Sequence, residues 1–209
     1  LVGSEMCIRD RGWNPDSDKE IFDENELINS FQFKQVQKKS AVFDEKKLLW
    51  ISQQHLSEMS VRDLMNEIYT LNPEWGNGLE WNYLKEVVKL IKDRSKTITE
   101  ITSMSEIFFK DKLEYDIDLL NKTFNDKSIA IIKDFQSALS LIEDWSRVEI
   151  EKIFEDIMEQ HEVAIGQVMK PVRVAISGIP FGPGIFDLIL LLGKEICQIR
   201  LRHALSIIQ

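Results

Sequence analysis

The chain of 209 residues is 44% hydrophobic and 29% charged, with 9 glycines and 5 prolines, a balance typical of a soluble globular protein rather than a disordered or collagen-like one. Its longest apolar stretch, Ile185 to Leu192, is interrupted by Asp187 and is far shorter than the roughly 20 residues that span a bilayer, so we expect no membrane segment. The formal net charge of −9 argues against a general nucleic-acid binder, because phosphate contacts need Lys and Arg. Any nucleic-acid site must therefore be local.

Cysteines and histidines are too few and too scattered for a disulfide framework or a metal site. Cys7 and Cys197 follow no secretory signal, so we expect a cytoplasmic protein. The histidines, His55, His161 and His203, do not form the zinc-protease pattern, and no phosphate-cradling glycine loop follows a strand. We expect no metal site and no catalytic residue in this chain.

Residues 1–11, LVGSEMCIRDR, fit no helix or strand period. They are similar to the conceptual translation of a transposase-type sequencing adapter that runs into an open reading frame. We therefore treat them as an adapter-like, non-native segment and exclude them from fold reasoning. The alternative is a native disordered terminus, which the nucleotide sequence would distinguish.

From Asn25 onward the chain reads as successive helices, and strand signals are almost absent. A helix over 45–58 is predicted by its apolar face and by Asp44, which can cap it. Ser60 begins the next helix, and the turn residues of 72–78 end it.

Residues 79–94 form an amphipathic pattern whose polar face carries regularly spaced lysines. If the helix extends far enough, these lysines form one stripe along it. The alternative is an ordinary solvated helix face. The four lysines are Lys85, Lys89, Lys92 and Lys96.

Three further helix starts follow from capping patterns and glycine or proline positions. Ser103 begins a short capping box. A long helix is predicted over 126–144, and Ser146 begins another that reaches about His161. Most of the acidic excess lies on these last two helices, on a face that we expect to be solvated.

The final stretch of the chain differs in that glycines and prolines separate its helices. Pro171 suits the first turn of a helix that Gly178 can end. A tight loop over 180–184 leads into an apolar helix over 185–192, and a single glycine separates it from a last helix over 194–207. We predict an all-α fold with two helical subdomains, residues 41–123 and 124–209.

The loop between these helices is the strongest candidate binding feature. Lys170 and Arg173 precede it, and its backbone amides lie at the start of the next helix, where a phosphate or an unpaired base could dock. Single-stranded RNA loops are recognised by stacking and by hydrogen bonds to base edges. These patterns alone indicate an all-helical binding module with an unidentified partner.

Four segments in order carry a more specific resemblance. Residues 12–22 resemble the segment after the catalytic domain of bacterial glutamyl-tRNA synthetases. Residues 41–50 resemble that family's F-D-x-x-K-L-x-W signature, and residues 92–109 are similar to R-x-K-T-L-x-E-x-x-x-M-x-x-F-F. Residues 169–205 resemble its ending, x-P-L-R-V-A-L-T-G followed by P-G-L-F-E and L-L-G-K-E.

This resemblance implies the cage-like anticodon-binding region of a class I synthetase, with the anticodon loop of tRNA(Glu) as its partner. The parent enzyme would use ATP and Mg²⁺ to activate glutamate, and its catalytic motifs would lie upstream of Gly12. Residues 12–40 would then be the linker after the catalytic domain. We expect a monomer that needs no cofactor of its own.

By position in the family motif, four residues would face the second and third anticodon bases: Arg173, Gly182, Pro183 and Ile185. Gly182 replaces the usual Thr or Ser, which removes one possible hydroxyl contact. Lys85 lies near the position at which some family members carry an arginine that helps to distinguish glutamate from glutamine anticodons.

Two alternatives stay open. The parent enzyme could be non-discriminating and also charge tRNA(Gln). In a different class of function, the chain could be a non-catalytic protein-interaction module whose acidic helices bind a basic partner.

Overall fold

A computed structural model describes residues 13, 19–36 and 44–208. Over these residues the fold is all-α, as predicted, with one isolated bridge between Trp13 and Val36 as the only strand-like pairing. No helix in the described part combines the length and apolarity that a membrane span requires. The adapter-like interpretation of residues 1–11 lies outside the described residues.

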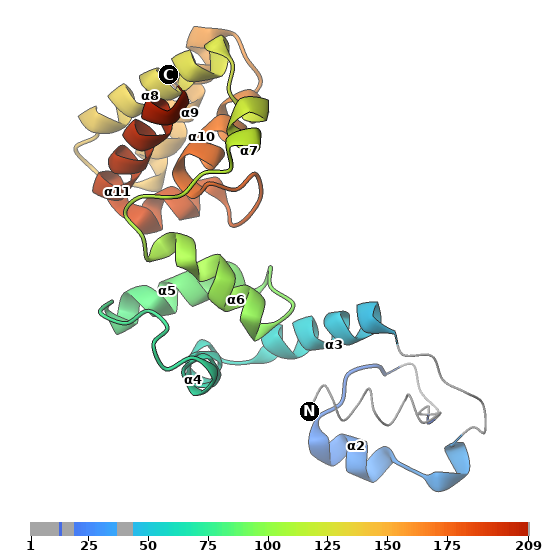
Figure 1. Cartoon of the computed structure of the whole chain (residues 1–209). Helices are drawn as coiled ribbons and strands as arrows, with labels where there is room; N and C mark the ends of the chain where they lie inside the picture. The colour runs from blue at the N-terminus through green and yellow to red at the C-terminus, as the bar shows by residue number, and fades with distance from the viewer. Residues whose placement is uncertain (1–12, 14–18, 37–43, 209) are drawn as a thin grey trace. The chain divides into compact units, whose positions relative to one another are not determined.

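The described residues form a succession of α-helices with two short 3-10 helices among them (Figure 1). The first half contains α2 (Glu24–Ser30), η1 (Phe33–Gln35), α3 (Glu45–Glu58), α4 (Val61–Leu71), α5 (Trp81–Lys92), α6 (Ile98–Ser105) and η2 (Glu106–Phe108). The second half contains α7 (Ile117–Thr123), α8 (Asp126–Leu141), α9 (Arg147–His161), α10 (Ile165–Ser177) and α11 (Ile185–Ile208).

Most predicted helix ends are confirmed by their caps. The Asp44 carboxylate accepts a hydrogen bond from the Lys47 amide at 3.1 Å, and the Ser60 hydroxyl accepts one from the Asp63 amide at 3.1 Å. Each bond satisfies an amide that the first helical turn leaves without a partner. Gly193, with φ of 78°, interrupts α11 where the sequence predicted a break.

Two helix starts were predicted wrongly. Ser103 lies inside α6, because this helix already begins at Ile98. Pro171 lies inside α10 rather than in its first turn. Its ring is buried and it lacks only one intrahelical hydrogen bond, so packing outweighs the local penalty of a proline within a helix.

The chain divides into two compact units, which differ from the predicted subdomains in how they combine segments. Unit 1 comprises residues 1–75 and 92–102, and unit 2 comprises residues 76–91 and 103–209. The predicted boundary between residues 123 and 124 falls within unit 2, where α7 packs against α10. The subdomain division stays a prediction.

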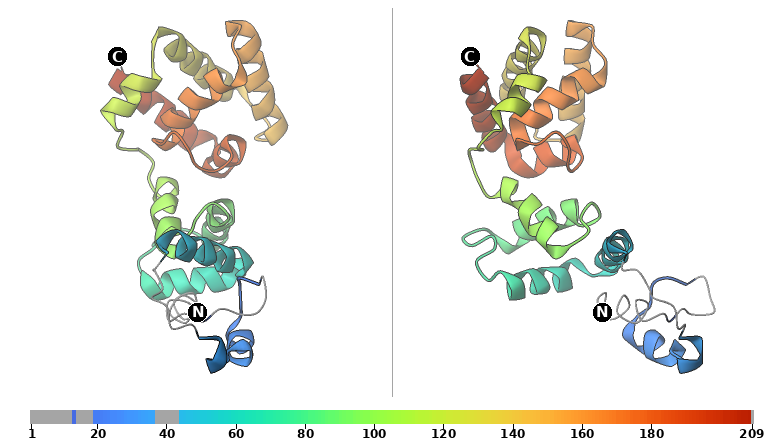
Figure 2. Two further views of the ribbon diagram at one scale, coloured as in Figure 1. Left: turned by 90° about the vertical axis from the view of Figure 1, so that its right-hand side faces the viewer. Right: turned by 45° about the vertical axis from the view of Figure 1, so that its right-hand side comes forward.

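The core of unit 2 lies between α8, α9, α10 and α11, which stay side by side in all views (Figures 1 and 2). Three phenylalanines meet edge to face there: the Phe135 and Phe154 ring centroids are 5.0 Å apart, and Phe154 lies 5.1 Å from Phe186. Fully burying such a side chain stabilises a fold by about 1.5–3 kcal/mol. The four-helix core therefore gives the α10–α11 connection a rigid base.

Unit 1 has its own apolar contacts. Trp13, Phe22 and Leu27 form a buried cluster, and the Trp13 indole donates to the Gln35 side chain at 3.1 Å. Trp75 is also buried and lies edge-on to Tyr69. These tryptophans pack in the core.

Candidate nucleic-acid interface

The loop between α10 and α11 is shaped by two glycines and a buried proline. Gly178 ends α10 in the left-handed conformation, with φ of 73°, and its amide donates to the Val174 carbonyl at 2.9 Å. Gly182 has φ of 148°, a conformation that other residues rarely adopt. Pro183 is buried and the next helix begins two residues later. The two glycines and the buried proline therefore set the path of the loop backbone in this structure.

Arg173 braces this loop from α10. Its Nη1 donates to the Pro183 carbonyl at 2.7 Å, across the base of the loop. The Ser177 hydroxyl adds a second tie: its Oγ lies 2.8 Å from the Arg173 carbonyl oxygen and 3.2 Å from the Ile179 carbonyl oxygen, and its one hydrogen can be donated to either. Arg173 as a whole is half-buried, so it has a structural partner without being fully enclosed.

The predicted contact residues differ in accessibility. Arg173 and Gly182 are half-buried, whereas the side chains of Pro183 and Ile185 are buried, Ile185 being only 3% exposed. A ligand could reach these last two residues through their backbone or through the loop's surface shape. The side chain that projects from the loop is that of Phe181, which is 76% exposed.

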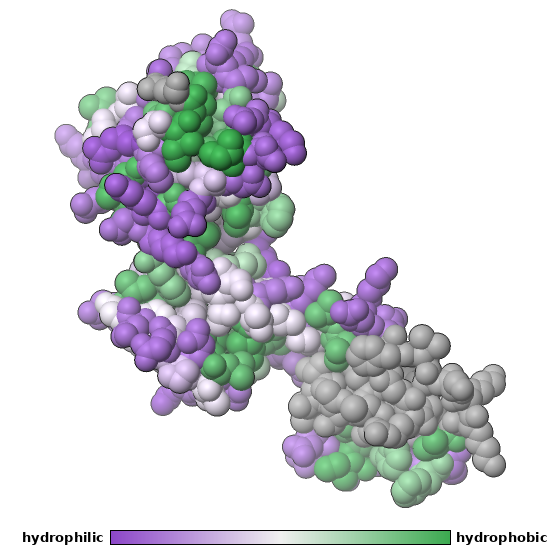
Figure 3. Space-filling model, viewed as in Figure 1, coloured by the Kyte–Doolittle hydropathy of each residue, from purple (hydrophilic) through white to green (hydrophobic). Residues whose placement is uncertain are grey.

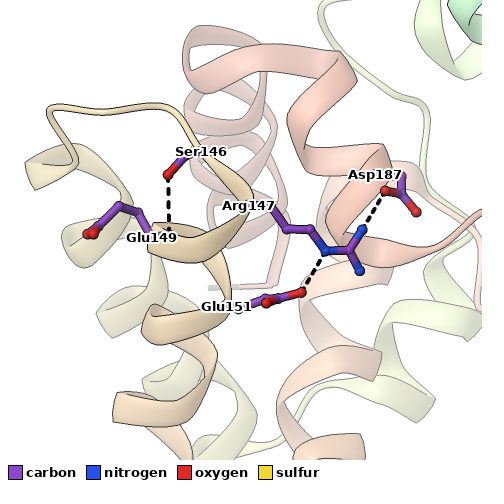
Figure 4. A network of polar contacts seen from close by, with 5 residues as sticks. All are labelled: Ser146, Arg147, Glu149, Glu151 and Asp187. Carbon is purple, nitrogen blue, oxygen red and sulfur yellow. Dashed lines mark hydrogen bonds and ion pairs between the residues drawn. The ribbon is translucent and has the colours of Figure 1, made fainter.

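A second arginine closes the start of α11 against α9 (Figure 4). Arg147 Nη1 contacts Asp187 Oδ1 at 2.8 Å, and its Nε contacts Glu151 at 2.7 Å. The guanidinium also lies 5.4 Å from the centroid of the Phe186 ring. The hydrogen bond with Glu151 is the main cause that raises the pKa of Arg147. This network neutralises the carboxylate next to the loop.

The sequence motifs do not identify Arg200, a fully buried arginine in α11. Its guanidinium donates only to backbone carbonyls, one of them on Ile176 of α10 at 2.8 Å. The others belong to the segment after α6, namely Ile107, Lys110 and Asp111. Burial lowers the pKa of Arg200, and it raises that of Tyr115, which donates to the Ala175 carbonyl at 2.6 Å, to about 12.

Helical periodicity contained a signal for Arg200. It lies three residues after Cys197 and four before Ala204, so all three share the buried face of α11. A charged residue on an apolar helix face indicates one of two things. Either the face was wrongly assigned as buried, or the charge is buried with partners of its own. Arg200 is the second case.

The predicted lysine stripe does not form. α5 ends at Lys92, so Lys96 lies beyond the helix. Lys92 donates to the Met59 carbonyl at 2.6 Å, and Lys89 pairs with Glu86 at 2.7 Å. Lys85 is exposed. Of the four lysines, only Lys85 and Lys89 lie exposed on α5 itself.

The remaining polar and aromatic residues differ in their surroundings. Across the described residues, no group of three or more His, Cys, Asp or Glu side chains could hold a metal ion. The Trp145 indole packs between helices and donates to the Leu190 carbonyl at 3.2 Å. Trp50 and Trp81, in contrast, are about half exposed, at 40% and 46%.

The geometry of a braced, exposed loop on a helical bundle agrees with a family match. Residues 52–205 match the family described as the anticodon binding domain. The chain belongs to this family. It is similar to the glutamate–tRNA ligases of Flavobacterium johnsoniae, at 32% identity, and of Desulforudis audaxviator, at 34%, over 93% of its own length in each case. It covers 39% and 41% of these two relatives, so it spans less than half of their length.

Solved structures support the same fold for this anticodon-binding domain. A glutamate tRNA ligase from Elizabethkingia meningosepticum, in complex with its amino acid, matches all of this chain with a TM-score of 0.85 at 24% identity. The glutamate–tRNA synthetase from Elizabethkingia anophelis matches 98% of it with a TM-score of 0.80 at 25% identity. The chain covers 41% and 40% of these proteins, and the predicted resemblance is confirmed.

Proposed function

We propose that this chain binds the anticodon loop of tRNA(Glu), as one part of a longer glutamate–tRNA ligase. The observation that carries the proposal is the α10–α11 loop, which Arg173 braces through the Pro183 carbonyl at 2.7 Å. A rigid loop beside a guanidinium suits the recognition of unpaired bases, which are bound by stacking and by hydrogen bonds to their edges. Membership of the anticodon binding domain family supports this assignment.

Each proposed contact has a role that its position allows. Arg173 supplies donors for a base edge, and Gly182 lets RNA approach the backbone closely, since it has no side chain. Pro183 and Ile185 are buried and hold the loop in shape beneath the RNA. Lys85 is exposed on α5 and can contact phosphate as a point charge.

The acidic surface does not contradict this proposal, because the charge is unevenly distributed. Hydrophilic side chains are interspersed with apolar ones on the face that Figure 3 shows. The acidic residues of α9 are mostly exposed, whereas Asp187, the carboxylate at the loop itself, is paired with Arg147. RNA binding would therefore centre on the loop, with Lys85 as an added phosphate contact.

The activity of the longer protein is also part of the proposal. A glutamate–tRNA ligase uses ATP and Mg²⁺, which we assign to the longer protein, because this chain spans less than half of its relatives' length. We propose no reaction step for this chain. The parent would be a cytoplasmic monomer that charges tRNA(Glu), and a non-discriminating form would charge tRNA(Gln) as well. Charging of both tRNA sets by the full-length enzyme tests this point.

A salt titration tests RNA binding by the chain itself. The RNA probe is a stem–loop carrying the anticodon loop of a glutamate tRNA, and the control has the same stem with a scrambled loop of equal length. Both have the same charge, so a preference for the first measures recognition of the loop. The logarithm of the binding constant should fall linearly with the logarithm of the salt concentration, because binding releases counterions from the RNA.

The alternative, a protein-interaction module that uses its acidic helices, gives the opposite result. Such a chain would bind neither stem–loop at physiological salt, and a basic protein would bind instead. Equal and weak binding of the two stem–loops would also contradict the proposed function, because it would reflect only phosphate contacts.

A further inference from the structure

The α10–α11 loop presents an aromatic ring to solvent. Phe181 is 76% exposed and makes no ring contact with any residue that the structure describes. Single exposed apolar residues are common on protein surfaces, and Phe33 is even more exposed, at 87%. Exposure alone therefore assigns no role to Phe181.

What distinguishes Phe181 is the way the chain holds it. Pro180 precedes it, and Gly182 and the buried Pro183 follow it. The backbone is tied on both sides: Ser177 Oγ contacts the Ile179 carbonyl at 3.2 Å, and Arg173 donates to the Pro183 carbonyl. The ring is thus held outward by a loop whose shape is already fixed, so a ligand that contacts it would not have to order the loop.

The surroundings of the ring favour a nucleic acid over an apolar partner. A Cβ placed on Gly182 would lie 3.7 Å from Arg173 Nη1, so the guanidinium is next to the residue that follows Phe181. Asp187, the carboxylate at the end of the loop, is bound by Arg147 at 2.8 Å. An aromatic ring, an adjacent guanidinium and a neutralised carboxylate suit a ligand with a flat apolar face and a negatively charged backbone.

We propose that Phe181 is a stacking platform for one unpaired nucleobase of the bound RNA loop. This inference rests on the proposed function and adds a residue that sets affinity at the same site. Stacking of a base on an aromatic side chain depends little on which base it is. Phe181 would therefore strengthen binding of the loop, while Arg173 reads a base edge.

The test measures binding of the full chain to a stem–loop RNA that carries the glutamate anticodon loop. 2-Aminopurine replaces each loop base in turn, because its fluorescence is quenched on stacking. Phe181→Ala should weaken binding roughly 10-fold and remove the quenching at one loop position. Phe181→Trp should keep both properties, and Phe181→Leu should bind with intermediate affinity and no aromatic quenching.

Two controls separate stacking from other effects. Phe33→Ala removes an even more exposed ring from unit 1 and should leave binding unchanged. An RNA that is abasic at the quenched position should bind the wild type and Phe181→Ala equally well. Because Phe181 is exposed, its variants should unfold at the same temperature as the wild type.

The outcomes that overturn this inference differ from those that overturn the proposed function. If the wild type prefers the anticodon loop but Phe181→Ala binds equally well, the stacking platform is wrong and loop binding stands. An equal loss with the abasic RNA would show a contact to the RNA backbone and would also reject stacking. If Phe181 instead mediates a protein contact or self-association, its replacement would leave RNA binding intact. If the wild type shows no preference for the loop, both proposals fail.

Discussion

Two regions of unit 2 use an arginine in different ways. In the interior, Arg200 is fully buried and its guanidinium donates to carbonyls of α10 and of the segment after α6. At the loop, Arg173 is half-buried and donates to the Pro183 carbonyl. The same side chain therefore joins distant segments in one place and braces an accessible loop in the other. Burial, rather than residue type, separates the structural role of Arg200 from the binding role proposed for Arg173.

The interior arginine should have the largest effect on stability. Arg200→Met keeps much of the side-chain volume but removes the donor of the Ile176 carbonyl, a buried contact, and of three partly buried carbonyls; a buried group left without a partner costs about 1–3 kcal/mol. We expect the free energy of unfolding to fall by about 3 kcal/mol or more, as measured by urea denaturation.

Arg202→Met is the matched control, because Arg202 lies on the same helix but is exposed. It should change stability by less than about 0.5 kcal/mol. If both variants lost the same amount, the carbonyl network of Arg200 would not be a major source of stability.

The loop arginine should affect binding more than folding. Arg173→Ala should cost about 1–3 kcal/mol in affinity for the anticodon stem–loop if Arg173 reads a base. Removal of its hydrogen bond to the Pro183 carbonyl should cost about 1 kcal/mol of stability. Arg173→Lys keeps the charge but not the planar donor set, so it should restore the salt dependence without restoring the preference for the correct loop.

A result in which Arg173→Ala loses stability but no RNA affinity would reverse this comparison. Arg173 would then resemble Arg200, acting only as a brace. The anticodon site would have to lie elsewhere, although membership of the family would stand.

Replacing Lys85 on α5 should have a smaller effect than replacing either arginine. Lys85→Ala should weaken binding of every RNA stem–loop to a similar extent and lower the slope of log affinity against log salt by about 1, as expected for one phosphate contact. Lys89→Ala serves as the comparison, because Lys89 is already paired with Glu86 at 2.7 Å. An unchanged salt slope in Lys85→Ala would remove this residue from the interface.

Local chemistry explains what the sequence could predict. Asp44, Ser60 and Gly178 act on the backbone within a few residues of themselves, so their roles as caps can be inferred from a short window. Pro171 was assigned to a first turn by the same local rule, and the packing of its helix made that assignment wrong.

Long-range packing explains what the sequence could not predict. Arg200 and Arg202 look alike in the sequence, and Arg200 differs because carbonyls about ninety residues earlier in the chain close around it. The accessibility of the loop residues depends on packing as well: Ile185 is buried by the bundle, whereas Phe181 projects from the loop. The position of the candidate loop was therefore predictable, but the side chain that it exposes was not.

A third arginine, Arg147, extends the comparison to a side chain on the solvent-exposed surface. Arg147 is bound to the carboxylates of Glu151 and Asp187 on the surface, where solvent and salt screen ion pairs. Arg147→Met should therefore change the unfolding midpoint less than either Arg200→Met or Arg173→Ala. It should still weaken RNA binding, because it leaves the Asp187 carboxylate unpaired beside the loop and exposes the RNA to its charge.

A double-mutant cycle distinguishes this indirect effect from a direct contact. If Arg147 acts by neutralising Asp187, the double variant Arg147→Met with Asp187→Asn should bind the stem–loop nearly as well as the wild type, since no unpaired carboxylate remains. If Arg147 touches the RNA itself, the double variant should bind as weakly as Arg147→Met alone. The first result would make burial the feature that ranks the three arginines in stability, and position relative to the loop the feature that ranks them in binding.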